Sequence, residues 1–133
     1  LSSSIQGAMP ARDQTDVMPG PIPKPLKARE LENWLCQNAD LTLVDVREKQ
    51  ELAIAPFPHP VKHLPLSEAQ NWMGTLNEFL PPTGPVVVLC HAGIRSWNFG
   101  CWLLEQQPAR DVWNLEGGID AWSVTVDPAV PRY

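Results

Sequence analysis

Cysteine is scarce in this chain: three of its 133 residues are cysteine, namely Cys36, Cys90 and Cys101. Their number is odd and no two have the CxxC spacing, which argues against a disulfide framework or a paired redox motif. The histidines form no metal-ligand spacing with these cysteines, so we expect no metal ion and no other cofactor. Reduced thiols are typical of a cytoplasmic protein, and we expect that location.

Runs of basic residues and long apolar stretches are missing as well. The ten lysines and arginines are scattered and the net charge is −5, which argues against a nucleic-acid partner because phosphate binding depends on clustered positive charge. No apolar run approaches the ~20 residues that span a bilayer, and the first residues lack the charged-then-apolar order of a secretory signal. We therefore expect no membrane span, and an anionic substrate must be bound by local hydrogen-bond donors.

The composition itself predicts one folded domain preceded by an arm. Hydrophobic residues make up 44% of the chain and charged residues 19%, a balance typical of soluble globular proteins. Residues 1–25 hold a serine run and five prolines without a periodic apolar pattern, which predicts a flexible Pro-rich N-terminal arm. Residues 26–133 are then predicted to form a single domain.

Strand-like and helix-like segments alternate after residue 27. Short apolar runs predict strands, and segments with apolar residues at helical spacing predict helices. Ser67 and Gln70 resemble a capping box, which predicts one helix that continues until Pro81 stops it. The predicted strands cover residues 41–46, 61–64, 85–89 and 111–115, and the predicted helices begin near residues 27, 67, 95 and 118. This alternation predicts an α/β fold with a mainly parallel sheet.

The most continuous apolar run ends at Cys90, and ligands of parallel sheets bind at the carboxyl ends of the strands. Residues 90–96, with the sequence CHAGIRS, lie between this strand and a helix start, where backbone N–H groups lack helical partners and can converge on an anion. The helix dipole and Arg95 favour a thiolate, and Gly93 lets the backbone turn sharply. Cys90 is therefore predicted to be a nucleophile, the alternative being a buried cysteine that only ends a core strand.

Three motifs, in this order, resemble the signatures of the rhodanese superfamily. They are Asp45-Val46-Arg47-Glu48, the Cys-x4-Arg-Ser motif of residues 90–96, and Leu-Glu-Gly-Gly-Ile-Asp-Ala-Trp at residues 115–122. The resemblance covers about Pro25 to Tyr133, and residues 126–133 are similar to the end of small single-domain members from cyanobacteria. Residues 56–63 depart from the family pattern, so the rim of the site is expected to differ.

The resemblance implies a three-layer α/β/α domain with a central, mainly parallel five-stranded sheet. It also implies a sulfurtransferase in which Cys90 is the catalytic residue and carries sulfur as a persulfide. The donor would be thiosulfate or a related small anion, and the acceptor would be cyanide, a thiol or an acceptor protein. Asp45 and Arg47 would give structural support by ion pairing. The residues implied in substrate binding are His91, Ala92, Gly93, Ile94, Arg95 and Ser96.

Two alternative functions stay open at this point. A rhodanese-like module that carries sulfur or binds a partner without turnover would keep the same fold. A phosphatase of this superfamily would use Cys-x5-Arg, a loop one residue longer, whereas this chain has the shorter form that suits a persulfide. Cys101, about three helical turns beyond Cys90, and Cys36 are predicted to be packed core thiols.

Overall fold

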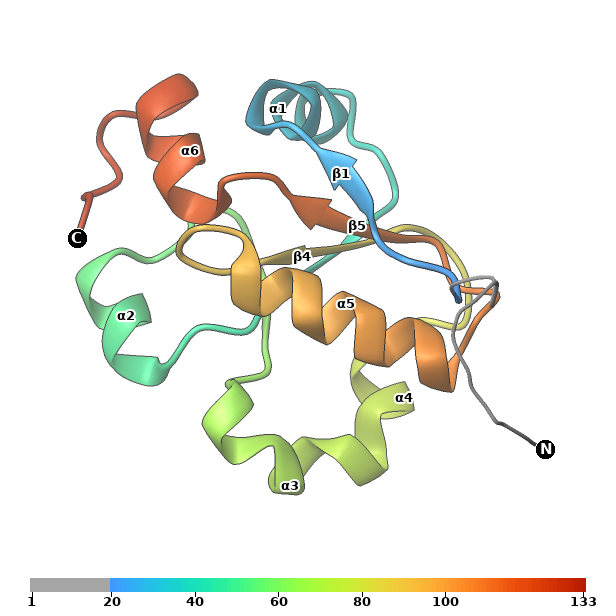
Figure 1. Cartoon of the computed structure of the whole chain (residues 1–133). Helices are drawn as coiled ribbons and strands as arrows, with labels where there is room; N and C mark the ends of the chain where they lie inside the picture. Colours follow the sequence, from blue (N-terminus) through green and yellow to red (C-terminus); the bar gives the residue numbers. More distant parts are fainter. Residues whose placement is uncertain (1–19) are drawn as a thin grey trace, which may run out of the picture.

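The computed structural model describes residues 20–133, which fold around one parallel sheet (Figure 1). Its strand order is β1-β5-β4-β2-β3, and every neighbouring pair is parallel. The strands are β1 (Lys24–Leu26), β2 (Thr42–Asp45), β3 (Lys62–His63), β4 (Val86–Leu89) and β5 (Val112–Leu115). The predicted α/β class and five-stranded parallel sheet are confirmed.

Strand β4 lies in the middle of the sheet because its sequence suits burial on both faces. All four of its residues, Val86 to Leu89, are fully buried. Continuous apolar strands of this kind are typical of parallel sheets covered by helices on both sides. The residue that follows β4 therefore emerges at the carboxyl edge of the sheet, directly from its most buried strand.

Strand β1 begins at Lys24, two residues before the predicted boundary between arm and domain. Lys24 and Pro25 belong to β1, where they pair with Trp113 and Asn114 of β5. Proline is tolerated there because β1 is an edge strand, where one side of the backbone needs no partner in the sheet. Residues 1–19 of the predicted arm lie outside the described residues.

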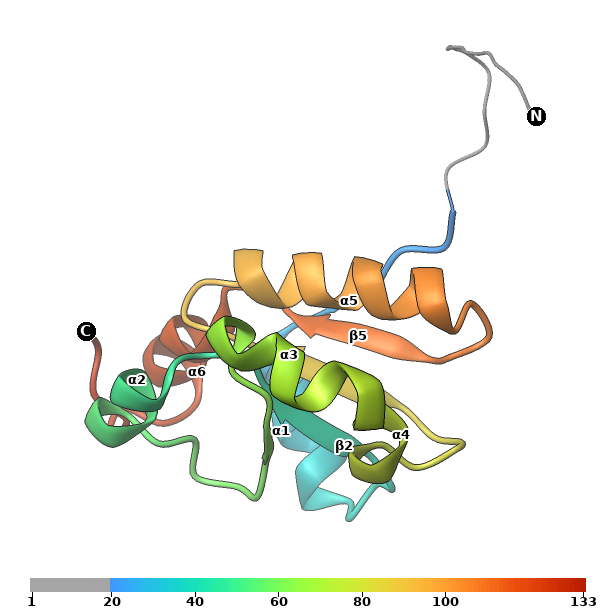
Figure 2. The ribbon, with the colours of Figure 1, turned by 90° about the horizontal axis from the view of Figure 1, so that it is seen from below.

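Helices cover both faces of the sheet, which makes the three predicted layers (Figures 1 and 2). One face carries α1 (Ala28–Cys36) and α6 (Gly118–Thr125), and the other carries α3 (Ala69–Trp72), α4 (Leu76–Phe79) and α5 (Ile94–Gln106). Alternate residues of each strand point to opposite faces. Val86 and Val88 thus pack with α3, α4 and α5, whereas Val87 and Leu89 pack with α1 and α6.

The helix predicted to run from residue 67 to about residue 80 is wrong as a single element. The segment instead consists of η2 (Leu66–Glu68), α3, η3 (Met73–Thr75) and α4. The Ser67 hydroxyl, which the capping box assigned to the helix start, donates to the Glu48 carboxylate instead, and the Ser67 N–H bonds the same carboxylate at 3.2 Å. A tertiary partner has therefore replaced the predicted local one.

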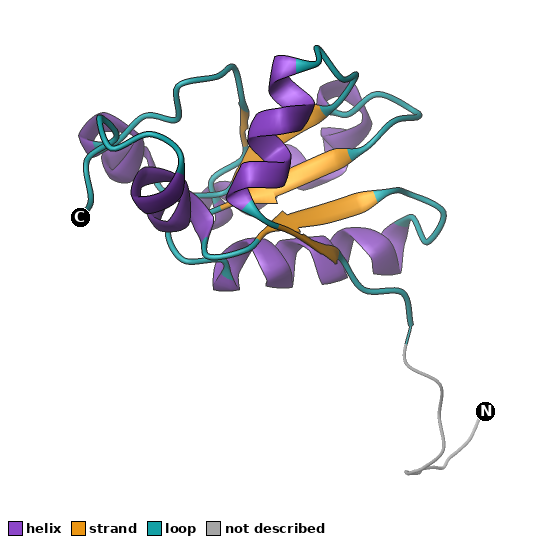
Figure 3. Cartoon of the chain, turned by 90° about the horizontal axis from the view of Figure 1, so that it is seen from above, coloured by secondary structure: helices purple, strands orange, loops and turns teal. Residues whose placement is uncertain are grey.

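One helix was not predicted at all, namely α2 (Lys49–Ile54). None of its residues is buried, so it lacks the apolar periodicity on which the other helix predictions depended. It follows β2 and lies at the carboxyl end of the sheet. The β4–α5 loop, the start of α6 and the C-terminal segment lie at the same end (Figures 1 and 3). Within residues 20–133, no helix is long and apolar enough to cross a membrane.

Candidate active site

The loop between β4 and α5 surrounds the sulfur of Cys90 with backbone N–H groups. Cys90 is 1% exposed, and its Sγ accepts hydrogen bonds from the N–H of Gly93 at 3.1 Å and of Ser96 at 3.4 Å. Gly93 has a φ of +99°, a left-handed conformation that glycine adopts without strain. This turn starts α5 at Ile94, so the sulfur lies at the N-terminal end of that helix.

Two buried side chains, those of Ser96 and Asn114, fix the loop by hydrogen bonds. The Ser96 hydroxyl lies 3.3 Å from the Cys90 Sγ and donates to Asn114 Oδ1 at 2.5 Å. The amide nitrogen of Asn114 donates in turn to the Gly93 carbonyl at 3.1 Å. Asn114 was not predicted as a site residue, although a polar side chain inside the apolar strand β5 is a signal that could have found it.

Helix α6 holds the loop from the other side. In the first turn of α6, the N–H of Ile119 donates to the Cys90 carbonyl at 2.8 Å, and the N–H of Asp120 donates to the His91 carbonyl at 3.1 Å. Gly118 precedes them with a φ of +63°, and a Cβ at this position would overlap the same two carbonyls. The structure shows that Gly118 allows α6 to approach the loop closely enough for its N–H groups to bond the two carbonyls.

The remaining residues of the loop, His91, Ala92 and Ile94, are half-buried or exposed. Ala92 is exposed, and Ile94 is 72% exposed, the largest value among the large hydrophobic residues of the described chain. His91 is half-buried, and the edge of its ring packs against the Tyr133 ring at 4.3 Å between centroids. Of the residues predicted to bind substrate, Gly93 and Ser96 thus contact the sulfur, whereas His91, Ala92 and Ile94 are half-buried or exposed. Their roles stay predictions.

Arg95, the remaining residue of that predicted set, is paired with a carboxylate that the sequence had not indicated. Its two terminal nitrogens lie 2.6 and 2.8 Å from the oxygens of Glu51 on α2. The Tyr133 hydroxyl donates to Glu51 at 2.9 Å. Hydrogen bonds from Arg95 lower the pKa of Glu51 to about 2, and the same pair raises the pKa of Arg95.

Asp45 and Arg47 form a fully buried ion pair. Arg47 Nη2 lies 2.8 Å from Asp45 Oδ2, and both side chains are inaccessible to solvent. Arg47 also donates to the Tyr133 hydroxyl at 3.1 Å, and its carbonyl bonds the His63 ring at 2.7 Å. The pair therefore connects the end of β2 to β3 and to the C-terminal segment. An ion pair between these residues was expected, and their role as structural support for the site stays a prediction.

The other cysteines lie apart from this loop. Cys36, the last residue of α1, is exposed, so the prediction of a packed core thiol is wrong for it. Cys101 is half-buried on α5, and burial raises its pKa. Within residues 20–133, no three His, Cys, Asp or Glu side chains are placed to share a metal ion.

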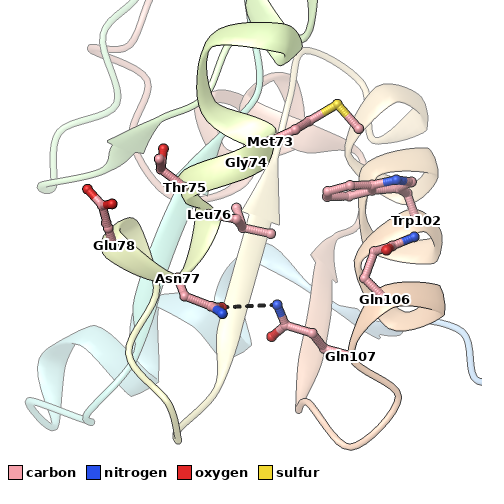
Figure 4. A pocket seen from close by; sticks show the side chains of 9 residues that line it. All are labelled: Met73, Gly74, Thr75, Leu76, Asn77, Glu78, Trp102, Gln106 and Gln107. Atoms are coloured by element: carbon pink, nitrogen blue, oxygen red, sulfur yellow. Dashed lines mark hydrogen bonds between the residues drawn. The ribbon is translucent and has the colours of Figure 1, made fainter.

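A hollow of about 470 Å³ lies elsewhere, between the η3–α4 segment and α5 (Figure 4). Asn77 and Gln107 bond across it at 3.0 Å, and Met73 and Trp102 lie at its other end. Cys90 and its loop are not among the residues that line it. The candidate active site is therefore defined by converging donors around a sulfur and not by the size of a cavity.

Comparisons with known proteins agree with this geometry. The model of the "Rhodanese-like domain" family matches residues 27–125. Over 91 residues the chain is 40% identical to the chloroplastic Rhodanese-like/PpiC domain-containing protein 12 of Arabidopsis thaliana, covering 68% of this chain and 30% of that protein. Over 105 residues it is 31% identical to the putative sulfurtransferase YtwF of Bacillus subtilis, covering 79% of this chain and 95% of that protein.

Among solved structures, a rhodanese-like domain protein from Staphylococcus aureus superposes with a TM-score of 0.61 at 29% identity. The match covers 74% of this chain and 90% of that one. The chain thus spans nearly the whole length of the two bacterial relatives, but under a third of the plant protein.

Proposed function

Since the chain belongs to the family of rhodanese-like domains, we propose that it is a sulfurtransferase that carries a sulfur atom as a persulfide on Cys90. Relatives named as sulfurtransferases match it over most of their own length, which supports sulfur transfer as the class of reaction. The finer assignment, with thiosulfate or a related donor and with cyanide, a thiol or an acceptor protein as acceptor, is part of this proposal.

In the first half-reaction, the Cys90 thiolate attacks the outer sulfur of thiosulfate. A bond forms between Sγ and that sulfur, the S–S bond of thiosulfate breaks, and sulfite leaves with the bonding electron pair. In the second half-reaction, an acceptor thiolate or cyanide attacks the outer sulfur of the persulfide and releases the Cys90 thiolate. Such a covalent intermediate corresponds to a ping-pong mechanism.

One observation carries this proposal: two backbone N–H groups, those of Gly93 and Ser96, point at the Cys90 Sγ. Donors fixed by the fold stabilise negative charge on an atom without reorganising during the reaction. These donors therefore stabilise the Cys90 sulfur when it carries negative charge, as a thiolate does before attack. The Cys-x4-Arg loop, one residue shorter than that of the related phosphatases, supports a persulfide over a phosphate ester as its occupant.

The test is mass spectrometry of the protein after incubation with thiosulfate, combined with a steady-state assay of transfer to cyanide. Wild-type protein should gain the mass of one sulfur atom on the peptide that contains Cys90. Cys90→Ser should lose this mass gain and all transfer, because a serine hydroxyl remains protonated and forms no persulfide. Cys101→Ser, the matched control, should retain both.

Two results would contradict the proposal in different ways. If Cys90→Ser keeps its activity while Cys101→Ser loses it, Cys90 is not the sulfur carrier. If wild-type Cys90 gains one sulfur but the protein completes no second turnover with any acceptor, the function is that of a sulfur-carrying module and not of an enzyme.

A further inference from the structure

Glu51 occupies the position in which an anionic substrate would meet Arg95. Both terminal nitrogens of the Arg95 guanidinium are bonded to the two Glu51 oxygens, at 2.6 and 2.8 Å. This is the bidentate geometry in which arginine also binds sulfonate-like anions. A donor that uses Arg95 must therefore compete with a carboxylate that is already in place.

The Glu51 carboxylate is held there by two further donors. One oxygen accepts the Tyr133 hydroxyl at 2.9 Å, and the other accepts the backbone N–H of Glu48 at 2.9 Å. The side chain is 18% exposed. With Arg95, three different residues donate to it, so its displacement by a substrate would break several charge-assisted hydrogen bonds.

The second arginine near the site is neutralised in the same way. Arg47 is paired with buried Asp45 at 2.8 Å and has no exposed surface. Its contact with Tyr133 links it to Glu51, so the two ion pairs belong to one network. The positive charges of both arginines are thus balanced before any substrate arrives.

We propose that Glu51 is a specificity-determining residue that selects the sulfur donor by charge. By neutralising Arg95, it makes the site favour a sulfane donor with a single negative charge, such as an organic thiosulfonate, over the doubly charged thiosulfate. This inference rests on the proposed function of Cys90, because it concerns the donor of that reaction.

The chemical step is the same for both donors. The Cys90 thiolate attacks the terminal sulfur of methanethiosulfonate, a bond forms between the two sulfurs, and methanesulfinate leaves with the electron pair of the broken S–S bond. No external oxidant or reductant is needed. Methanethiosulfonate differs from thiosulfate by a methyl group in place of one charged oxygen, so the two donors isolate the effect of charge.

The experiment compares kcat/KM for methanethiosulfonate and thiosulfate, with cyanide as acceptor, in wild-type protein and in Glu51→Gln. The wild type should prefer methanethiosulfonate. Glu51→Gln keeps the shape and removes the charge, so its kcat/KM for thiosulfate should rise and the preference should fall by about three- to tenfold, the range for a partly exposed charged contact. Glu105→Gln, the matched control, makes the same charge change near the far end of α5 and should leave the preference unchanged.

The outcomes separate this inference from the proposed function. If wild-type protein transfers sulfur from neither donor, the proposed function fails. If both donors work and Glu51→Gln keeps the wild-type preference, the role of Glu51 is refuted while sulfur transfer stands. Should Glu51→Gln not fold, inhibition of the wild type decides: stronger inhibition by methanesulfonate than by sulfate supports the inference, and the reverse order overturns it.

Discussion

Two segments of the candidate active site meet at the ion pair between Arg95 and Glu51, and they contribute to the site in different ways. The β4–α5 loop presents backbone groups to the Cys90 sulfur, whereas residues 46–51, which run from the end of β2 into the first turn of α2, present the Glu51 carboxylate to Arg95. The loop is held by hydrogen bonds from α6 and from Asn114. Residues 46–51 are held by ion pairs and by Tyr133.

This difference assigns separate tasks to the two segments. Backbone donors cannot be changed by substituting their own side chains, so the loop fixes the chemistry that any substrate meets. Charged side chains change with a single substitution, so residues 46–51 can alter which donor is accepted while the chemistry persists. Variants in the two segments should therefore differ in what they disturb.

The largest effect is expected from removing one partner of the buried ion pair. Arg47→Met should lower the free energy of unfolding by about 3–5 kcal/mol, because it leaves the Asp45 carboxylate buried and uncompensated. Urea unfolding at pH 7 measures this change. The double variant Asp45→Asn/Arg47→Met removes both charges and should recover part of the loss. A double variant less stable than Arg47→Met would show that the ion pair is not the source of the effect.

A smaller loss of stability, together with a lower kcat for sulfur transfer, is expected from Gly118→Ala. The added Cβ would overlap the carbonyls of Cys90 and His91 and would strain a residue at φ +63°, which together should cost about 2–3 kcal/mol. Displaced carbonyls move the loop donors off the sulfur, so kcat should fall about tenfold or more. Gly74→Ala, where a Cβ meets nothing within 4 Å, is the matched control. Unchanged kcat in folded Gly118→Ala would refute the role of α6.

The sequence predicted the loop better than the segment that faces it, for a physical reason. Cys90, Gly93 and Ser96 lie within seven residues of each other, directly after an unbroken apolar run, and their geometry is local. By contrast, Glu51 and Arg95 are 44 residues apart, and α2 buries no residue that would reveal it as a helix. Contacts between distant, half-buried residues leave no periodic pattern in a sequence.

Other outcomes follow the same division between local patterns and tertiary partners. The alternating pattern sufficed for four of the five strands, namely β2, β3, β4 and β5, whereas a sheet of five strands was implied by the family resemblance. The pattern failed for Ser67, whose hydroxyl bonds Glu48, and for Pro25, which an edge strand accommodates. Asn114 could have been recognised by its polarity within β5, but its partners Gly93 and Ser96 could not.

The smallest effect is expected where the two segments meet the C-terminal residues, at Tyr133. Tyr133→Phe removes one donor from Glu51 while Arg95, the principal cause of its low pKa, remains, so the pKa of Glu51 should rise from about 2 and stay below 4.5. A folded-state pKa below the unfolded value adds stability that is present above pH 4.5 and is lost as pH falls towards 2. The variant should therefore be less stable at pH 7, by roughly 0.5–1 kcal/mol for this partly exposed contact, and the difference should shrink as pH falls through that window.

Urea unfolding between pH 7 and pH 2, with NMR titration of the Glu51 carboxyl, measures both quantities. Because Tyr133 is the only tyrosine of the chain, loss of the tyrosine absorbance verifies the variant directly. A stability difference that stays constant down to pH 2 would mean that the Tyr133 hydroxyl acts through its bond with Arg47 and not through the charge of Glu51.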